Sequence, residues 1–226
     1  MPGSDWDYFM SNYYGDPYMM WHDGIDEKSV VRLEGEERIQ AEDMLIKSLE
    51  EGSHYGAIGL RELRSQRAVP HLLKMLRSSQ GTLAVETAVA LSVIQDSFDY
   101  VPHIIGVLRS AAFWSNRISA ARALRRFPKD EVVEALFESV ASDPDYLVRN
   151  HASETLLFLH GMEPSISSHE EIFGHMIVDP DREKGVSREA AFSHYKLSAE
   201  LLRKLIAEQG KLRSGGIISD IWTWKY

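Results

Sequence analysis

The chain has 226 residues, 44% of them hydrophobic and 26% charged, which are the proportions of a folded protein with a sizeable core. It contains no cysteine, which excludes disulfides, thiolate metal sites and a cysteine nucleophile, and is typical of a reducing compartment. Residues 1–52 carry 13 acidic and 4 basic side chains, which accounts for the whole formal net charge of -9. Such an acidic region repels nucleic acid and suits a basic partner.

Neither the start of the chain nor its interior indicates a membrane or an export signal. Residues 1–10 have no basic region followed by an apolar run, as a signal peptide would. The chain also has no uninterrupted stretch of about 18 apolar residues, the length that a membrane-spanning helix needs. We therefore expect a cytoplasmic protein.

Residues 1–33 form an aromatic, acidic segment, and its first 24 residues show no helical period. The first 24 residues hold seven aromatic side chains among aspartates and glycines: Trp6, Tyr8, Phe9, Tyr13, Tyr14, Tyr18 and Trp21. Tyr and Trp offer a large contact area and dominate interface hot spots. Two interpretations stay open, because the segment could bind a basic partner or could fold back to seal the end of a repeat array.

A polar helix is predicted next, over residues 34–52, where it would cap the repeats that follow. Two segments further on, residues 69–78 and 101–110, share the pattern V-P-H-[LI]-[LI]-x-x-L-R-S and lie 32 residues apart. Residues 131–140 keep the apolar spacing without the proline. Proline suits the first turn of a helix, where its missing N–H would have no partner within the helix.

A second pattern, small-x-x-Leu-x-x-apolar, precedes these segments and recurs at intervals of 31, 33 and 32 residues. It places one apolar stripe on each of four helices. Its members are Ala57, Leu60 and Leu63; Ala88, Leu91 and Ile94; Ala121, Leu124 and Phe127; and Ser153, Leu156 and Leu159. One such helix pair cannot bury its apolar face alone, so the pairs must stack. We predict an all-α protein, an α-solenoid of about four helix pairs over residues 53–177.

The opening of the fourth unit, D-P-D-x-x-V-R-x-x-A at residues 143–152, resembles HEAT repeats and their short phycobilisome-lyase-type relatives. The resemblance covers residues 53–177. It implies stacked helix pairs whose second helices line a concave binding face, and it does not specify a function, because HEAT modules serve scaffolds, enzymes and inhibitors alike.

Residues 178–226 are expected to hold a C-terminal cap helix and an aromatic tail. Residues 187–208 carry an amphipathic stripe, interrupted only by Ser198, and Gly210 suits the end of the helix. The tail ends in aromatic side chains that include Trp222 and Trp224.

Metal and catalytic motifs are weak. His169 and Glu170 resemble the His-Glu pairs that hold di-iron in HEAT-type deoxyhypusine hydroxylases, but this chain has only one such pair. His71 and His103 occupy equivalent repeat positions without an acidic neighbour. The chain has no G-x-S-x-G, P-loop or G-x-G-x-x-G motif. We therefore expect no metal, no cofactor and no enzymatic activity.

A basic cluster leaves an alternative open. It consists of Arg117, Arg122, Arg125, Arg126, Lys129 and Arg149. HEAT-like alkylpurine DNA glycosylases bind DNA through a concave basic surface, so the cluster could contact phosphates in an enzyme or a repair-like protein. The competing interpretation is a structural one, in which Arg117 and Arg149 pair with acidic groups of adjacent repeats. The neutral repeat region favours the structural interpretation.

The sequence thus predicts a non-enzymatic protein-binding module. One specific form is an immunity or inhibitor protein that occludes a toxin or another basic partner. Nucleic acid and membrane are not expected as partners. The candidate partner-binding residues are Trp6, Tyr13, Tyr14, Tyr18, Trp21, Arg117, Arg149, Trp222 and Trp224.

Overall fold

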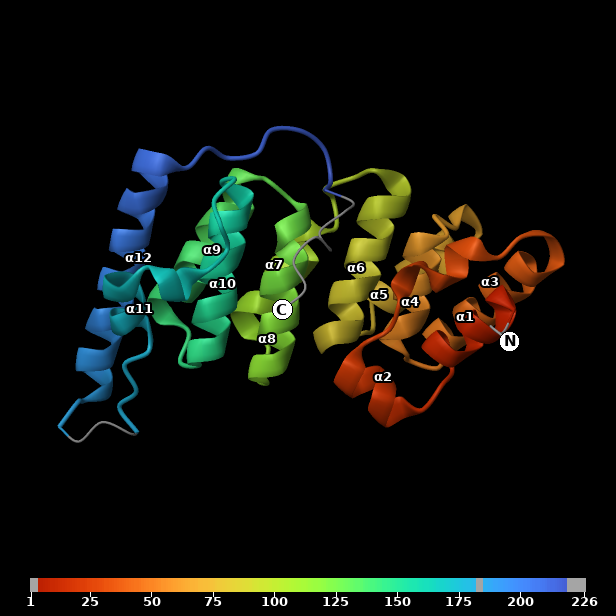
Figure 1. Ribbon diagram of the computed structural model, residues 1–226, viewed down its shortest axis with the longest axis horizontal. Helices are drawn as coiled ribbons and strands as arrows, with labels where there is room; N and C mark the ends of the chain where they lie inside the picture. Colours follow the sequence, from red (N-terminus) through yellow and green to blue (C-terminus); the bar gives the residue numbers. More distant parts are fainter. Residues whose placement is uncertain (1–3, 182–184, 219–226) are drawn as a thin grey trace. The chain divides into compact units, whose positions relative to one another are not determined.

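The computed structural model describes residues 4–181 and 185–218, and every regular element within them is helical. This confirms the predicted all-α class, because the helices pack in neighbouring pairs as in a HEAT-like α-solenoid. The chain divides into two compact units, Met1–Tyr100 and Val101–Tyr226, which are treated separately (Figure 1). None of the helices in the described residues is long and apolar enough to cross a membrane.

Unit one contains the N-terminal segment, the first helix pair and the first helix of the second pair. Its elements are α1 (Asp5–Tyr13), α2 (Pro17–Asp23), η1 (Glu27–Arg32), α3 (Gly35–Glu50), α4 (His54–Glu62), η2 (Gln66–Ala68), α5 (Val69–Leu76) and α6 (Gly81–Gln95). Helix α4 packs against α3 and against α6, its counterpart one repeat on, while α5 packs against α6 (Figure 1). Stacking of equivalent helices therefore begins within this unit.

Unit two contains the second helix of the second pair, the third and fourth helix pairs and the C-terminal helix. Its elements are α7 (Val101–Ser110), α8 (Trp114–Ala123), η3 (Leu124–Arg126), α9 (Asp130–Ser142), α10 (Tyr146–Leu159), η4 (Ile166–Ser168), α11 (Glu170–Met176) and α12 (Arg188–Gln209). Helices α8 and α10 contact each other, as do α7 and α9, so first helices meet first helices and second helices meet second helices. Helix α12 packs against α9 and α11.

The core follows the recurring apolar pattern. All twelve of its positions are buried, and Leu60, Leu91, Leu124 and Leu156 have no exposed surface. Because each leucine recurs at the same place in its repeat, the cores of successive pairs are built from equivalent residues. The repeat alignment derived from the sequence is thereby confirmed.

Helices α3 and α4 approach each other unusually closely at Gly56. A Cβ atom on Gly56 would lie 2.5 Å from the backbone nitrogen of Leu49 and 2.7 Å from the carbonyl oxygen of Leu45. Contacts this short with rigid backbone atoms exclude any side chain. The helix-to-helix spacing therefore depends on glycine at this position.

The prediction that residues 1–24 have no helical structure is wrong, because α1 and α2 lie within them, and η1 follows in the rest of the segment. Each of these elements is capped by a side chain. Ser4 and Asp7 form a reciprocal capping box at α1, Asp16 accepts a bond from the Met19 amide at α2, and Asp26 accepts one from the Lys28 amide at η1. Side-chain caps satisfy the otherwise unpaired first amides of a short helix, and a search for apolar periodicity does not detect them.

We expect Leu91→Ala in unit one and Leu124→Ala in unit two each to destabilise the protein by about 2–5 kcal/mol, because each leaves a cavity in a stacked core. Thermal or urea unfolding followed by circular dichroism measures the change. Leu197→Ala, at a position 39% exposed on α12, is the control and should cost less than about 1 kcal/mol. Wild-type stability of both core variants would contradict the repeat alignment.

A matched pair of glycine substitutions tests the close approach of α3 and α4. Gly56→Ala should lower the free energy of unfolding by about 1–3 kcal/mol, because the new methyl group meets backbone atoms. A Cβ on Gly106, in α7, would have no neighbour within 4 Å. Gly106→Ala should therefore raise stability by about 0.5–1 kcal/mol through helix propensity alone. Equal unfolding curves for the two variants would show that α3 and α4 do not meet at Gly56.

Candidate protein-binding surface

Helix α1 is anchored in unit one by two of its aromatic side chains. Phe9 is fully buried and Tyr13 is 4% exposed, with their ring centroids 5.3 Å apart. The Tyr13 hydroxyl donates a 2.7 Å hydrogen bond to the backbone carbonyl of Glu27. Burial, assisted by the Glu27 charge, raises the pKa of Tyr13, so the hydroxyl remains a donor. These two residues hold the segment onto the repeats and are not accessible to a partner.

A buried arginine fastens the next part of the segment. Arg61, at the end of α4, is 3% exposed and pairs with three carboxylates. It bonds Glu27 of η1, Glu62 at 2.9 Å and Glu86 of α6 at 3.0 Å. Burial lowers the pKa of Arg61, but the three carboxylates together outweigh it and the net shift is upward. The guanidinium therefore stays charged and ties η1, α4 and α6 together.

Helix α2 exposes an aromatic face that we call the α2 ridge, formed by Tyr18, Met19, Trp21 and His22. Tyr18 is 63% exposed, Met19 50% and Trp21 75%. The Tyr18 and His22 rings stack with centroids 5.6 Å apart. On the opposite side of the helix, Met20 is 8% exposed, and its carbonyl accepts a bond from the Tyr55 hydroxyl at 3.3 Å. One face of α2 thus contacts the rest of unit one, and the other presents large apolar side chains to solvent.

The candidate aromatic residues therefore divide into groups. Tyr18 and Trp21 are exposed on the α2 ridge, whereas Tyr13 is buried, and Trp6 and Tyr14 are partly buried beside Phe9. Trp222 and Trp224 lie outside the described residues. The structure brings together two of the predicted aromatic residues as a surface, and it adds Met19 and His22, which the sequence did not single out.

In unit two, Arg117 forms the ion pair that the structural interpretation predicted. Its Nε and Nη2 donate to the two carboxylate oxygens of Asp143 at 2.7 and 2.9 Å. Its Nη1 donates to the carbonyls of Ala111 and Ala112, just beyond the end of α7. The side chain joins the ends of α7, α8 and α9, and each of its three nitrogens already donates within the chain.

For Arg149, the prediction of an acidic partner side chain is wrong. Arg149 is 1% exposed and donates to the carbonyl of Asp143 at 2.6 Å and to the carbonyl of Met176 at 2.6 and 2.9 Å. The Tyr195 ring lies against its guanidinium, with 3.6 Å from Cζ to the ring centroid. Burial is the main cause that lowers the pKa of Arg149. The acceptors of Arg149 are therefore backbone carbonyls at the ends of α9 and α11, and the Tyr195 ring of α12 covers its guanidinium.

The rest of the basic cluster is also engaged within the chain. Arg125 donates to Thr155 and pairs with Glu154 of α10, and buried Arg126 donates to the carbonyl of Ile218. Arg122 and Lys129 have partners as well. A phosphate-binding surface needs cations that are free to contact the backbone. Arg117, Arg126 and Arg149 are buried, so three of the six cations of the cluster are not available to a phosphate backbone.

The histidines do not gather into a metal centre in the part of the chain that the structure describes, where no three His, Asp or Glu side chains are grouped for an ion. His169 is the residue before α11, and His71 bonds Glu50 at 2.8 Å. His175 and His194 approach each other with their Nδ1 atoms 2.8 Å apart. Their contact joins α11 to α12.

The comparisons with known proteins agree with the repeat architecture. A family model described as HEAT repeats matches residues 101–172, which lie in unit two. Neither the curated proteins nor the solved structures include a match to this chain. HEAT repeats typically act as non-enzymatic scaffolds for protein–protein interaction, and residues 101–172 are similar to such repeats.

Two substitutions separate the anchoring aromatic residues from the exposed ones. Phe9→Ala should lower the free energy of unfolding by about 3–5 kcal/mol, because it empties a fully buried site. Trp21→Ala should change it by no more than about 0.5 kcal/mol, because most of the indole is in solvent. Denaturant unfolding of both variants is the measurement. A large loss for Trp21→Ala, or none for Phe9→Ala, would contradict the division.

Proposed function

We propose that this chain is a non-enzymatic protein-binding module whose partner presents a basic surface to the α2 ridge. The observation that carries this proposal is the exposure of Tyr18, Met19 and Trp21 on one docked helix. Soluble proteins seldom leave large apolar side chains together on a surface unless that surface contacts something. Tyr and Trp are the residues that most often supply interface binding energy.

Charge supports a basic partner. Asp16 and Asp23 lie at the two ends of the α2 ridge, and residues 1–52 carry 13 acidic against 4 basic side chains. Opposite charge speeds the encounter and orients the partner. The exposed indole of Trp21 also offers its ring face to a lysine or arginine through a cation–π contact. Aromatic contact area and acidity thus favour the same class of surface.

A finer proposal is that the module is an immunity or inhibitor protein, which occludes a toxin or another harmful basic protein. The small size, the acidic N-terminal region and the repeat scaffold support it. We also propose that the repeats are related to those of the phycobilisome-lyase type, because of the motif at residues 143–152. We further propose a cytoplasmic location, which suits the cysteine-free composition.

Parallel affinity capture tests the proposed function. The full-length chain and its Tyr18→Ala/Trp21→Ala variant are immobilised and exposed to lysate of the native host, and the bound proteins are identified by mass spectrometry. We expect the wild type to retain a protein with more Lys and Arg than Asp and Glu. The captured protein is then purified. The double variant should bind it at least about tenfold more weakly than the wild type does, because two hot-spot side chains are lost.

Trp114→Ala is the matched control, since it removes an indole that is 48% exposed on α8 in unit two. This variant should bind the purified protein like the wild type. Equal affinity of the wild type and the double variant would overturn the α2 ridge as the contact surface. A retained partner with an acidic surface would overturn the proposed charge complementarity.

A further inference from the structure

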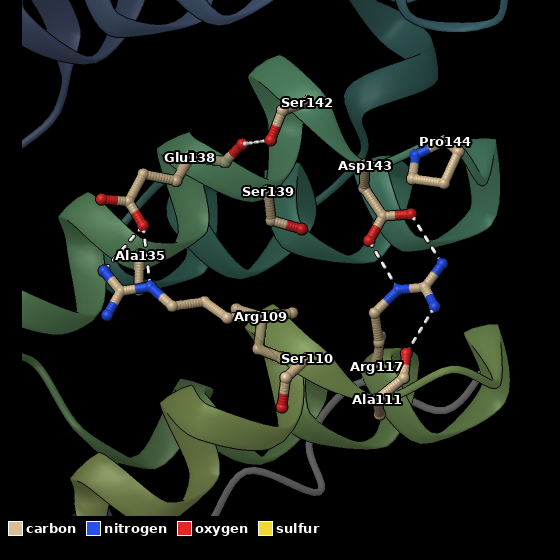
Figure 2. A pocket seen from close by; sticks show the side chains of 11 residues that line it. Arg109, Ser110, Ala111, Arg117, Ala135, Glu138, Ser139, Ser142, Asp143 and Pro144 are labelled. Carbon is tan, nitrogen blue, oxygen red and sulfur yellow. Dashed lines mark hydrogen bonds and ion pairs between the residues drawn. The ribbon is translucent and has the colours of Figure 1, made fainter.

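A groove of about 310 Å³ lies in unit two between the C-terminal ends of α7 and α9. Figure 2 shows Arg109 and Ser110 on one side and Glu138, Ser139 and Ser142 on the other. Helices α7 and α9 are the second helices of successive repeats, which line the face that the HEAT resemblance assigns to binding. The groove is partly open, so a side chain of another protein could enter it.

The cations in this groove are already neutralised. Arg117 donates hydrogen bonds to the Asp143 carboxylate and to two backbone carbonyls. Arg109 donates from Nε and Nη2 to one oxygen of Glu138, Oε2, at 2.9 and 2.6 Å (Figure 2). An anion entering the groove would therefore have to displace an existing ion pair, which disfavours phosphate or carboxylate as the ligand.

The groups left over are hydrogen-bond acceptors. Both contacts from Arg109 go to Oε2 of Glu138, so no residue among 4–181 and 185–218 bonds Oε1, which belongs to a side chain that is 56% exposed to solvent. The hydroxyls of Ser110 and Ser142 donate to the carbonyls of Gly106 and Glu138 at 2.7 Å, so only their lone pairs remain. Helices α7 and α9 both end here, and helix C-termini carry partial negative charge. The groove therefore suits a positively charged donor.

Ser139 is a second, independent sign of a missing ligand. Its side chain points from α9 toward α7 in Figure 2, and the residue is 8% exposed. Unlike the hydroxyls of Ser110 and Ser142, the Ser139 hydroxyl makes no hydrogen bond within the described part of the chain, although the Ser139 carbonyl accepts one from the Asp143 amide. A buried hydroxyl without a partner is energetically costly. A donor that enters the groove can satisfy it after a rotation of the Ser139 side chain.

The acceptors fit lysine better than arginine. Arginine binds carboxylates most strongly as a fork across both oxygens, and Oε2 of Glu138 is already occupied by Arg109. Lysine is a compact charge with three rotatable donors, which matches the single carboxylate oxygen of Glu138 that Arg109 leaves open at the rim of the groove (Figure 2). Leu108, Ala135 and Pro144 line the rest of the groove and offer apolar contacts to the methylene groups of a lysine.

We infer that the groove between α7 and α9 receives a lysine side chain of the partner protein, with its ammonium group bound to Oε1 of Glu138. This inference rests on the proposed function, because it names one feature that the basic partner must carry. It concerns unit two alone and does not depend on the α2 ridge.

The test is an NMR titration of the ¹⁵N-labelled full-length chain with acetylated hexalysine amide at physiological ionic strength. We expect saturable shifts of the backbone amides of residues 109–111 and 138–143. Glu138→Gln should weaken the binding that these amides report by about two- to fivefold, because it removes the charge of a carboxylate that is more than half exposed. Ser139→Ala should weaken it by a smaller factor and leave the fold intact.

Glu134→Gln is the matched control. Glu134 lies one turn earlier on α9 and pairs with Arg203 of α12, so it carries the same charge without facing the groove. This variant should bind hexalysine like the wild type. Equal affinities of wild type and Glu138→Gln, or no shift at the groove amides, would overturn the inference. Equal or tighter binding of hexa-arginine at the same amides would overturn the choice of lysine.

The groove and the proposed function can fail separately. Hexalysine shifts confined to unit one would reject the groove and leave the α2 ridge as the contact with a basic partner. A wild-type affinity of the Tyr18→Ala/Trp21→Ala variant for the captured protein would reject the α2 ridge, and the groove amides would still report on lysine binding.

Discussion

Arg61 and its three carboxylates are the contact that fixes the N-terminal segment of unit one to its repeats. A guanidinium buried away from water must find its acceptors inside the protein, and removal of one partner of a buried pair costs about 3–5 kcal/mol. Here the acceptors come from η1, α4 and α6, so the pair with Glu27 fixes the N-terminal segment against the repeats. Phe9 and Tyr13, both buried, add apolar contacts that hold α1 of the same segment in place. The aromatic side chains Tyr18 and Trp21 of α2 remain exposed to solvent in this arrangement.

Unit two uses the same kind of joint at the D-P-D motif. The Asp143 carboxylate accepts Arg117 from the preceding pair, and the Asp143 carbonyl accepts Arg149 from the helix that follows. Asp145 caps α10 through the Leu147 amide. The motif therefore works as a junction between α8, α9 and α10, which explains these residue types without a catalytic or nucleic-acid-binding role. It also removes Arg117 and Arg149 from the surface, where a phosphate could have met them.

The sequence predicted those parts of the fold that repeat along the chain. Apolar periodicity identified the stacked core, because each helix buries one stripe and the stripe is visible in the residue order. Apolar periodicity did not reveal the helices of residues 5–32, because these helices are stabilised by side-chain caps and tertiary contacts. Arg61 could have been found from its place after Leu60, which matches Arg125 after Leu124. The groove could not have been predicted from the sequence, because residues on its two walls, such as Arg109 and Glu138, are 29 residues apart in the chain. Which oxygen of Glu138 remains unbonded depends on the geometry of that ion pair.

The most direct test of the central claim is amide hydrogen exchange of the full-length chain, alone and in complex with its captured basic partner. A short helix such as α2 opens often, so a protein lying on it should slow exchange there. We predict slower exchange in residues 16–24 on binding, with no change in residues 196–201 on the outer part of α12. Unchanged exchange in residues 16–24, with protection elsewhere in the chain, would contradict the claim that the α2 ridge is the binding surface.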